Sequence, residues 1–164
     1  MHEIVILIAK YFIVLACLGA LIVWLGLKTT DKKRFIIATI IGAIITLLLA
    51  KLSSKVFYDT RPFVAGHFTP YFSHGSDNGF PSDHTLFASF LAFLTWHYSK
   101  KTGQILLVIA LLIGLSRVIA GVHHLIDIIG SVIFAYVGVK LAFMAMERFL
   151  KHRQPPQRVR HSKE

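Results

Sequence analysis

Five long apolar blocks dominate the sequence and restrict the folds that are open to it. A helix of roughly 20 apolar residues crosses the hydrocarbon core of a bilayer and satisfies its own backbone hydrogen bonds there. The blocks run over Ile4–Leu27, Phe35–Ser54, Asp83–Tyr98, Gln104–Val122 and His124–Met146, and the third is the shortest, with the most polar start. They predict an all-α integral membrane helical bundle with about five transmembrane spans. We expect one domain, residues 1–150, followed by a basic tail, residues 151–164.

The overall composition supports the membrane class and excludes several others. Of the 164 residues, 55% are hydrophobic and 16% are charged, whereas a soluble domain carries about 25% charged residues. The net charge is +10, but the basic residues lie between the apolar blocks and in the tail, as topology signals do, and not along one nucleic-acid-binding stripe. We therefore expect membrane lipids, and no nucleic acid, as partners. Cys17 is the single cysteine, which excludes an intrachain disulfide and a cysteine-based metal site.

The positions of the basic residues also predict the orientation of the chain. Basic clusters occupy residues 28–34, residues 100–101 and the tail from Arg148 onward. If the chain crosses the membrane five times, all three clusters fall on the same side. The positive-inside rule places that side, with the C-terminus, in the cytoplasm. The N-terminus, the loop 57–82 and the turn near Gly121–His124 are then extracytoplasmic.

The stretch Gly114–Asp127 carries ionisable residues inside this apolar chain. Charged groups in a membrane segment are costly, so they indicate a functional site. His123 and Asp127 are four residues apart, and on one continuous helix their side chains would share a face. A carboxylate in that position orients an imidazole as a nucleophile or base; the alternative is a buried structural ion pair. Arg117 precedes His123 by six residues, with Gly121 between them to let the chain turn.

The remaining unusual polar residues fall at the same depth in the predicted topology. They are Lys55 at the end of the second span, Arg61 in the loop, Pro81–His84 at the start of the third span, Arg117 near the outer end of the fourth, and His123 with Asp127 at the outer start of the fifth. Histidines with unrelated structural roles would not all fall at one depth in the membrane. We therefore expect an active site at the outer end of the bundle.

Phosphoryl transfer is the chemistry that suits such a cluster. Arginines bind phosphate oxygens in bidentate fashion and stabilise the charge of the transition state. Ser82 is a natural N-cap, and a helix N-terminus is itself an anion site. His84, in the first turn, is placed to donate a proton to a leaving oxygen, while His123, steadied by Asp127, would attack phosphorus. Asp83 beside a phosphate is unfavourable, so we expect it to point away, bond an arginine or discriminate among substrates.

Three ordered stretches carry a resemblance to a known family. Arg61-Pro62, Pro81-Ser82-Asp83-His84 and Ser116-Arg117-x5-His123-x3-Asp127 resemble the three signatures of the type 2 phosphatidic acid phosphatase superfamily. These proteins are membrane lipid phosphatases and fold relatives of vanadium haloperoxidases. The resemblance covers about Lys55 to Asp127. The stretches R-P-F-V-A, F-P-S-D-H and S-R-V-I-A-G-V-H-H are most similar to the bacitracin-resistance type of undecaprenyl-diphosphate phosphatase.

The resemblance implies a reaction and a set of roles. It implies hydrolysis of undecaprenyl diphosphate to undecaprenyl phosphate, on the extracytoplasmic side of a bacterial plasma membrane, by a multi-pass enzyme of cell wall biosynthesis. It implies a phosphohistidine intermediate on His123, with His84 as acid and then base, and neither metal nor cofactor. Ser82, Arg61, Arg117 and the lysine that precedes Arg61 would hold the phosphate of the lipid substrate.

The sequence departs from the family pattern in three places. Asp83 stands where the family usually has glycine. Lys55 is separated from Arg61 by five residues in place of the usual six, so Lys51 or solvent is an alternative for the lysine role. The family core commonly has six spans, whereas about five are predicted here, which affects packing around the lipid tail.

Other interpretations remain open from the residues alone. A phosphatidylglycerophosphate or phosphatidate phosphatase would have similar motifs. A small transporter or proton-relay protein could also hold ionisable residues in the membrane, but it would distribute them through the bilayer depth or near its midplane. The sequence indicates neither the oligomeric state nor whether loop 57–82 closes over substrate.

The loop and its surroundings contain further titratable residues. We expect His67 and His74 to be exposed, with gating or substrate contact as the alternative, and His124 to line the rim of the site. Asp59 and Asp77 show no tight metal-ligand spacing, so metal catalysis is not expected.

Overall fold

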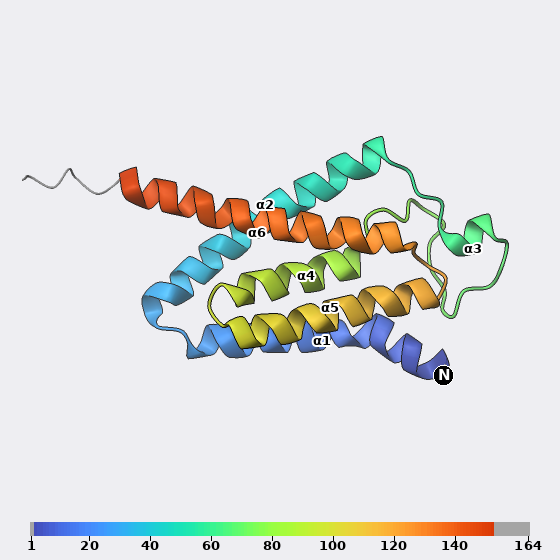
Figure 1. The fold of residues 1–164 in the computed structure, drawn as a ribbon, viewed down its shortest axis with the longest axis horizontal. Helices are drawn as coiled ribbons and strands as arrows, with labels where there is room; N and C mark the ends of the chain where they lie inside the picture. The colour runs from blue at the N-terminus through green and yellow to red at the C-terminus, as the bar shows by residue number, and fades with distance from the viewer. Residues whose placement is uncertain (1, 153–164) are drawn as a thin grey trace, which may run out of the picture.

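The computed structural model describes residues 2–152 and contains six helices, five of which run in alternating directions along one bundle (Figure 1). They are α1 (His2–Gly26), α2 (Thr29–Val56), α3 (Pro62–Ala65), α4 (Asp83–Trp96), α5 (Lys100–Ile119) and α6 (Leu125–His152). No strand forms among these residues, where one isolated bridge joins Thr60 and Asn78. The expected all-α fold is confirmed. Because the directions alternate, the start of α1, the α2–α4 segment and the α5–α6 turn lie at one end of the bundle (Figure 1).

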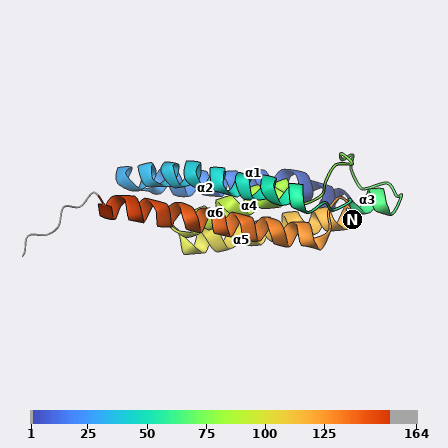
Figure 2. The ribbon, with the colours of Figure 1, turned by 90° about the horizontal axis from the view of Figure 1, so that it is seen from above.

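The central helix α4 is enclosed by the others. It lies between α1 and α2 on one side and α5 and α6 on the other (Figure 2) and contacts all four. Leu86, Phe90 and Leu94 of this helix are buried, whereas the four enclosing helices direct many isoleucines and leucines outward. Outward-facing apolar side chains are what a lipid environment requires.

Four helices in the described part of the chain are long and apolar enough to cross a membrane: α1, α2, α5 and α6. The expected third span, Asp83–Tyr98, forms α4, which has 14 residues and a length of about 21 Å. This is shorter than the roughly 30 Å hydrocarbon core of a bilayer. The second helix begins earlier than expected, at Thr29, because the basic segment that precedes the second apolar block is also helical. The expected tail, 151–164, lies outside the described residues except for the helical backbone at 151–152.

Small residues allow α2 and α6 to approach closely. Ala38, Gly42, Thr46 and Ala50 are buried at intervals of four residues along α2. Thr46 lies against Gly138 of α6, and Gly42 lies near Ala142. Without a hydrophobic driving force between helices in lipid, such close contacts of small residues stabilise the association.

Gly138→Leu should lower the melting temperature of the detergent-solubilised protein. A side chain at this position would meet the Thr46 hydroxyl and the Gly42 carbonyl oxygen, and overpacking of this kind costs about 1–3 kcal/mol. Gly26→Leu is the matched control, because nothing lies within 4 Å of a Cβ added there. Equal melting temperatures for the two variants would contradict the close packing of α2 on α6.

Candidate functional site

Buried polar side chains gather where the α2–α4 segment meets the α5–α6 turn. Arg61, Ser82, Arg117, His123 and Asp127 are all buried there. They come from three separate parts of the chain: the α2–α4 segment, α5, and the turn that enters α6 with its first residues. Buried charges are retained only when they are paired or hydrogen-bonded, so the partners of each group define the site.

The imidazole of His123 is held from both sides. Its Nδ1 lies 3.1 Å from Asp127 Oδ2, and its Nε2 lies 3.3 Å from Arg61 Nη1. A guanidinium can only donate hydrogen bonds, so Nε2 carries the lone pair and the Nδ1–H donates to Asp127. Burial lowers the pKa of His123 and the charges of Arg117 and Arg61 lower it further, against the raising effect of the Asp127 hydrogen bond. The ring is therefore neutral at pH 7, and the lone pair of Nε2 is directed at Arg61 Nη1.

Asp127 also caps α6. Its Oδ2 accepts the His124 backbone N–H at 2.9 Å, which is the reach-back bond of a capping box. The expectation that His123 and Asp127 lie on one continuous helix is wrong, because α6 begins at Leu125 and His123 lies in the turn before it. The two side chains still meet, because a carboxylate in the first helical turn faces back toward the residues that precede the helix. Gly121, with a φ of +77°, makes the turn, and only glycine adopts this conformation without strain.

Arg61 connects the α2–α4 segment to this turn. It donates to the Val122 carbonyl oxygen at 3.0 Å from Nη1 and to Asp77 Oδ1 at 3.0 Å from Nη2. Asp77 is 75% exposed. Burial by itself raises the pKa of Asp77, but the hydrogen bonds and charge of Arg61 outweigh it and lower the pKa below its ordinary value. Asp77 is therefore the counter-ion of Arg61.

The amide of Asn78 fastens the same segment to the end of α2. Its Oδ1 accepts from the backbone N–H groups of Asp59 at 2.9 Å and Phe80 at 3.0 Å. Its Nδ2 donates to the carbonyl oxygens of Ser54 and Phe57, both at 3.0 Å. All four hydrogen bonds of the side chain are made, and one of them satisfies a carbonyl at the C-terminus of a helix. Sequence analysis did not single out Asn78, since an asparagine before glycine in a loop is common.

Arg117 contacts a histidine of the α2–α4 segment, His74. Its Nη2 lies 2.8 Å from His74 Nε2, and its Nη1 donates to the Ala9 carbonyl oxygen at 3.4 Å. His74 was expected to be exposed. It is half-buried, and its ring packs edge-on against that of His123 with centroids 5.8 Å apart. No local pattern marks this residue, because it lies in an irregular segment far from Arg117 in sequence.

The first turn of α4 contributes the remaining predicted residues. Ser82 is the N-cap of α4, as expected, but its hydroxyl accepts from Thr85 Oγ1 at 3.2 Å and caps no backbone N–H. His84 is half-buried and lies close enough to Arg117 and His123 to interact with them electrostatically. Asp83 is exposed and interacts electrostatically with Arg117. The start of α4 therefore faces the same cluster as the two arginines.

The lysine predicted to help hold the phosphate, Lys55, does not bond to the buried polar cluster. Lys55 is exposed in the last turn of α2 and makes no hydrogen bond or ion pair with any residue that the structure describes, and Lys51 is also exposed. A different lysine, Lys10 of α1, lies with its Nζ 4.9 Å from the centre of the Phe72 ring. The same ring lies 5.7 Å from Arg117 Cζ. The structure thus brings Lys10, and not Lys55, to the loop that covers Arg117.

Asp59, His124 and Asp127 are the described residues that could ligate a cation together. One ligand atom from each lies within 4.8 Å of the others. However, His124 Nδ1 and Asp59 Oδ2 are 2.6 Å apart, which is the separation of a short hydrogen bond. Asp127 Oδ2 already accepts two hydrogen bonds. Protons alone account for this arrangement, and His124 lines the rim with its side chain 44% exposed.

An apolar groove borders the cluster. It has a volume of about 460 Å³ and lies between the end of α2 and the start of α6, with Phe57, Phe80, Ile126 and Ile129 among its lining residues. Phe80 immediately precedes Pro81-Ser82, and Ile126 immediately precedes Asp127. The groove therefore begins where the buried polar cluster ends.

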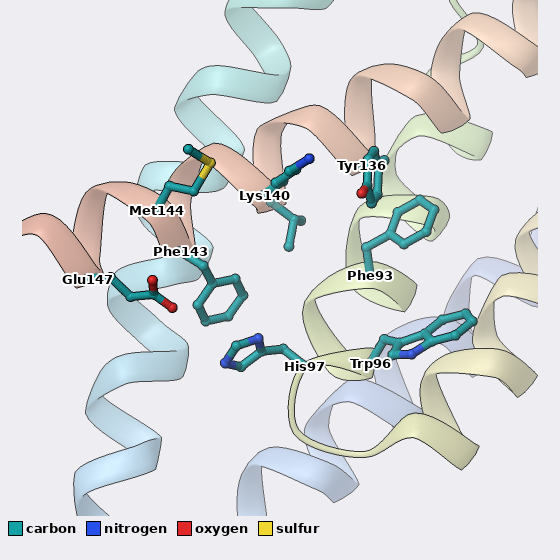
Figure 3. A pocket seen from close by; sticks show the side chains of 9 residues that line it. Phe93, Trp96, His97, Tyr136, Lys140, Phe143, Met144 and Glu147 are labelled. Carbon is teal, nitrogen blue, oxygen red and sulfur yellow. The ribbon is translucent and has the colours of Figure 1, made fainter.

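A second cavity lies at the opposite end of the bundle. It has a volume of about 470 Å³ and lies between α4 and α6 (Figure 3). The His97 ring stacks on Phe143 with centroids 3.7 Å apart, and Lys140 Nζ lies 5.7 Å from the Tyr136 ring. None of the residues of the histidine and arginine cluster lines this cavity.

The chain is similar to several known proteins. A family model described as the PAP2 superfamily matches residues 32–151. Undecaprenyl-diphosphatase BcrC of Bacillus subtilis (strain 168) is 34% identical over 137 residues, which cover 84% of this chain and 70% of that protein. Putative undecaprenyl-diphosphatase YbjG of Escherichia coli (strain K12) is 35% identical over 141 residues, with the same coverage of 84% and 70%. The crystal structure of a transmembrane PAP2-type phosphatidylglycerolphosphate phosphatase from Bacillus subtilis is similar with a TM-score of 0.45 and 23% identity, covering 86% of this chain and 83% of that chain.

The hydrogen bonds of Asn78 predict a specific weakness in the loop. Asn78→Asp removes two donors and sets a carboxylate against the Ser54 and Phe57 carbonyl oxygens, at a cost of about 1–3 kcal/mol for each unsatisfied group. Limited proteolysis should then cleave between residues 57 and 82 faster than in the wild type, with the helices intact. Ser76→Asp, at an exposed position of the same loop, is the control for the added charge; equal cleavage of both variants would contradict the role of Asn78.

Proposed function

Because the chain belongs to the PAP2 superfamily, we propose that it is a membrane lipid phosphatase that hydrolyses undecaprenyl diphosphate to undecaprenyl phosphate through a phosphohistidine intermediate. The observation that carries this proposal is the position of the His123 ring between Arg61 and Asp127. Arg61 and Asp127 hold the imidazole so that Nε2 presents a lone pair beside a guanidinium. A nucleophile oriented by a carboxylate, next to a cation that binds phosphate oxygens, is suited to attack on phosphorus.

The proposed reaction has two steps. His123 Nε2 attacks the terminal phosphorus, and the bond from that phosphorus to the bridging oxygen breaks while His84 donates a proton to the departing lipid phosphate. Water then attacks the phosphohistidine as His84 takes its proton, which releases inorganic phosphate and restores His123. The same residue serves as acid and then base, as proton balance requires.

Arg61 and Arg117 are assigned to hold the phosphate. Arg61 and Arg117 are buried and lie close enough for their like charges to interact. An anion between them relieves this repulsion, and preorganised donors of this kind stabilise developing charge without reorganisation. Ser82 and the N-terminus of α4 add further donors, and Asp83, exposed beside Arg117, restricts which headgroups can approach. We assign Lys55, the lysine of the family pattern, a weaker part in phosphate binding than the two arginines, because its side chain is exposed.

The apolar groove supports a lipid substrate. A hydrocarbon chain that leaves the reacting phosphate can enter the groove between α2 and α6 and continue into the bilayer, since the groove begins beside Phe80 and Ile126. The two curated relatives are named as undecaprenyl-diphosphatases, and a polyprenyl chain is wholly apolar, as the groove is.

We propose an extracytoplasmic site in a bacterial plasma membrane with five crossings. The basic segments at residues 28–34 and 100–101 lie at the opposite end of the bundle from the α5–α6 turn (Figure 1), so the positive-inside rule orients the cluster outward. α4, whose Leu86, Phe90 and Leu94 are buried among the other helices, completes the third crossing inside the bundle. The clustering at one end also disfavours a transporter or proton relay, whose ionisable groups would follow the depth of the membrane.

His123→Ala should abolish turnover, and Asp127→Ala should reduce it strongly but less severely. By analogy with catalytic triads, loss of the nucleophile costs on the order of 10⁶-fold in kcat and loss of the orienting carboxylate on the order of 10⁴-fold. Phosphate release by the purified variants measures both effects, with the melting temperature as a check that each is folded. A His123→Ala variant that releases phosphate at the wild-type rate rejects the nucleophile assignment.

The diphosphate assignment predicts an order among substrates. Undecaprenyl diphosphate should have a kcat/KM at least about tenfold above those of phosphatidylglycerophosphate and phosphatidate, a difference of about 1.4 kcal/mol, and activity should persist in EDTA. Measuring the three lipids side by side in detergent with EDTA tests both points. A preference for either phospholipid would make that lipid the substrate in place of undecaprenyl diphosphate. Activity that is lost in EDTA and restored by a divalent cation would assign a metal to Asp59, His124 and Asp127.

A further inference from the structure

His74 is the loop residue that reaches into the buried cluster. Its Nε2 lies 2.8 Å from Arg117 Nη2, and its ring packs edge-on on His123, the proposed nucleophile, at a centroid distance of 5.8 Å. Neither the mechanism above nor any motif in the sequence uses this imidazole. It nevertheless occupies the guanidinium edge that is proposed to bind phosphate.

The position of His74 is fixed by contacts on several sides. The Phe72 ring lies against Lys10 of α1, Arg117 of α5 and the His74 ring, at 4.9, 5.7 and 6.3 Å respectively. The Tyr71 backbone N–H donates to the Ala120 carbonyl oxygen at 3.1 Å. The segment that carries His74 is thus docked on the ends of α1 and α5, so the imidazole is held beside Arg117.

The protonation of His74 follows from its partners. Arg117 can only donate, so Nε2 of His74 must accept and its proton resides on Nδ1, which faces the Gly75 carbonyl oxygen at 3.3 Å. Burial lowers the pKa of His74, and the charges of Arg61 and Arg117 lower it further, while the Gly75 hydrogen bond raises it. The imidazole is therefore neutral at pH 7.

The charged and titratable groups that face His74 come from every neighbouring element. They are Lys10 of α1 across the Phe72 ring, Arg61 and Asp77 of the α2–α4 segment, His84 of α4, Arg117 of α5 and His123 of the α5–α6 turn. Cations and imidazoles outnumber the single carboxylate, and that carboxylate is bonded to Arg61. The surroundings favour the neutral imidazole until an anion arrives.

A phosphate oxygen that accepts the hydrogen bond of Arg117 Nη2 in place of His74 would face the lone pair of His74 Nε2. Two acceptors at this distance repel each other, and a docked loop leaves the imidazole little room to move aside. A nearby negative charge favours the protonated form of a histidine and raises its pKa. A proton taken up at Nε2 converts the repulsion into a charge-assisted hydrogen bond, which is about twice as strong as a neutral one.

From this geometry, and resting on the proposed function, we propose that His74 is a further phosphate-binding residue of the site, which takes up a proton from solvent when the phosphate binds and changes from an acceptor for Arg117 into a donor to the phosphate. The ligand class is a phosphate group with a free terminal end, either on the lipid substrate or as inorganic phosphate.

The test compares the binding of inorganic phosphate by full-length wild type, His74→Ala and His74→Gln in detergent, from about pH 6 to about pH 8.5, the range in which histidines titrate. Equilibrium titration requires no turnover. Glutamine can accept from Arg117 and donate to phosphate, but it cannot become charged. The comparison of His74→Gln with the wild type therefore isolates the added proton from the hydrogen bond that positions Arg117.

The wild type should bind phosphate about tenfold more tightly than either variant near pH 6, as expected for loss of a charge-assisted hydrogen bond. The ratio should shrink toward one as the pH rises through the pKa of His74 in the complex. The titration of phosphate itself and of His84 and His123 is common to all three proteins and cancels in the ratio. His67→Asn is the matched control, because His67 is exposed in the same loop, and its φ of 50° suits asparagine; its affinity should equal that of the wild type.

Two results would overturn the proposal. One is a ratio of wild-type to variant phosphate affinity that does not change with pH. The other is a His74→Gln variant whose affinity equals that of the wild type at every pH. Either result would mean that His74 only positions Arg117. Failure of the proposed function is a separate outcome, because it appears as absence of phosphate release by the wild type from every lipid phosphate, whatever the affinity ratio for inorganic phosphate.

Discussion

The buried guanidinium of Arg61 is the group on which the rest of the site depends. It joins two parts of the chain that are about 60 residues apart, because it donates to the Val122 carbonyl oxygen and lies 3.3 Å from His123 Nε2 while it is bonded to Asp77 on its other side. A buried charge is retained only when it is paired or hydrogen-bonded, and Arg61 has partners of both kinds. The path of the α2–α4 segment and the orientation of the His123 ring are therefore coupled through one side chain.

The bundle confines this network to one end. Along most of its length the enclosing helices present isoleucine and leucine outward and pack inward through small residues, as in the contact of Thr46 with Gly138. Ionisable groups are costly in the hydrocarbon region, and here they lie where the helices end and the loop begins. The same arrangement leaves the short helix α4 free to bring its N-terminus, with Ser82, beneath the loop without meeting lipid.

The electrostatic balance of the site explains its preference for an anion. Arg61 and Arg117 lie near three imidazoles. Among the residues that the structure describes, Asp127 is the one fully buried carboxylate, and it is already engaged by His123 and the backbone of His124. Burial and the two arginines keep His123 neutral, so the same charges that attract a phosphate also preserve the lone pair that would attack it. Recognition and activation of the nucleophile thus have a common physical origin.

Local pattern in the sequence determined the helical class, the alternation of apolar blocks and the meeting of His123 with Asp127, because helical periodicity and near-neighbour spacing are properties of short stretches. The tertiary structure alone decided that His74 lies against Arg117 and that Asn78 fastens the loop to α2. It also decided that Lys10, and not Lys55, approaches the loop over Arg117. These contacts join residues far apart in the chain through irregular backbone, where no period constrains which side chain faces inward. Only the packing of the whole bundle brings them together.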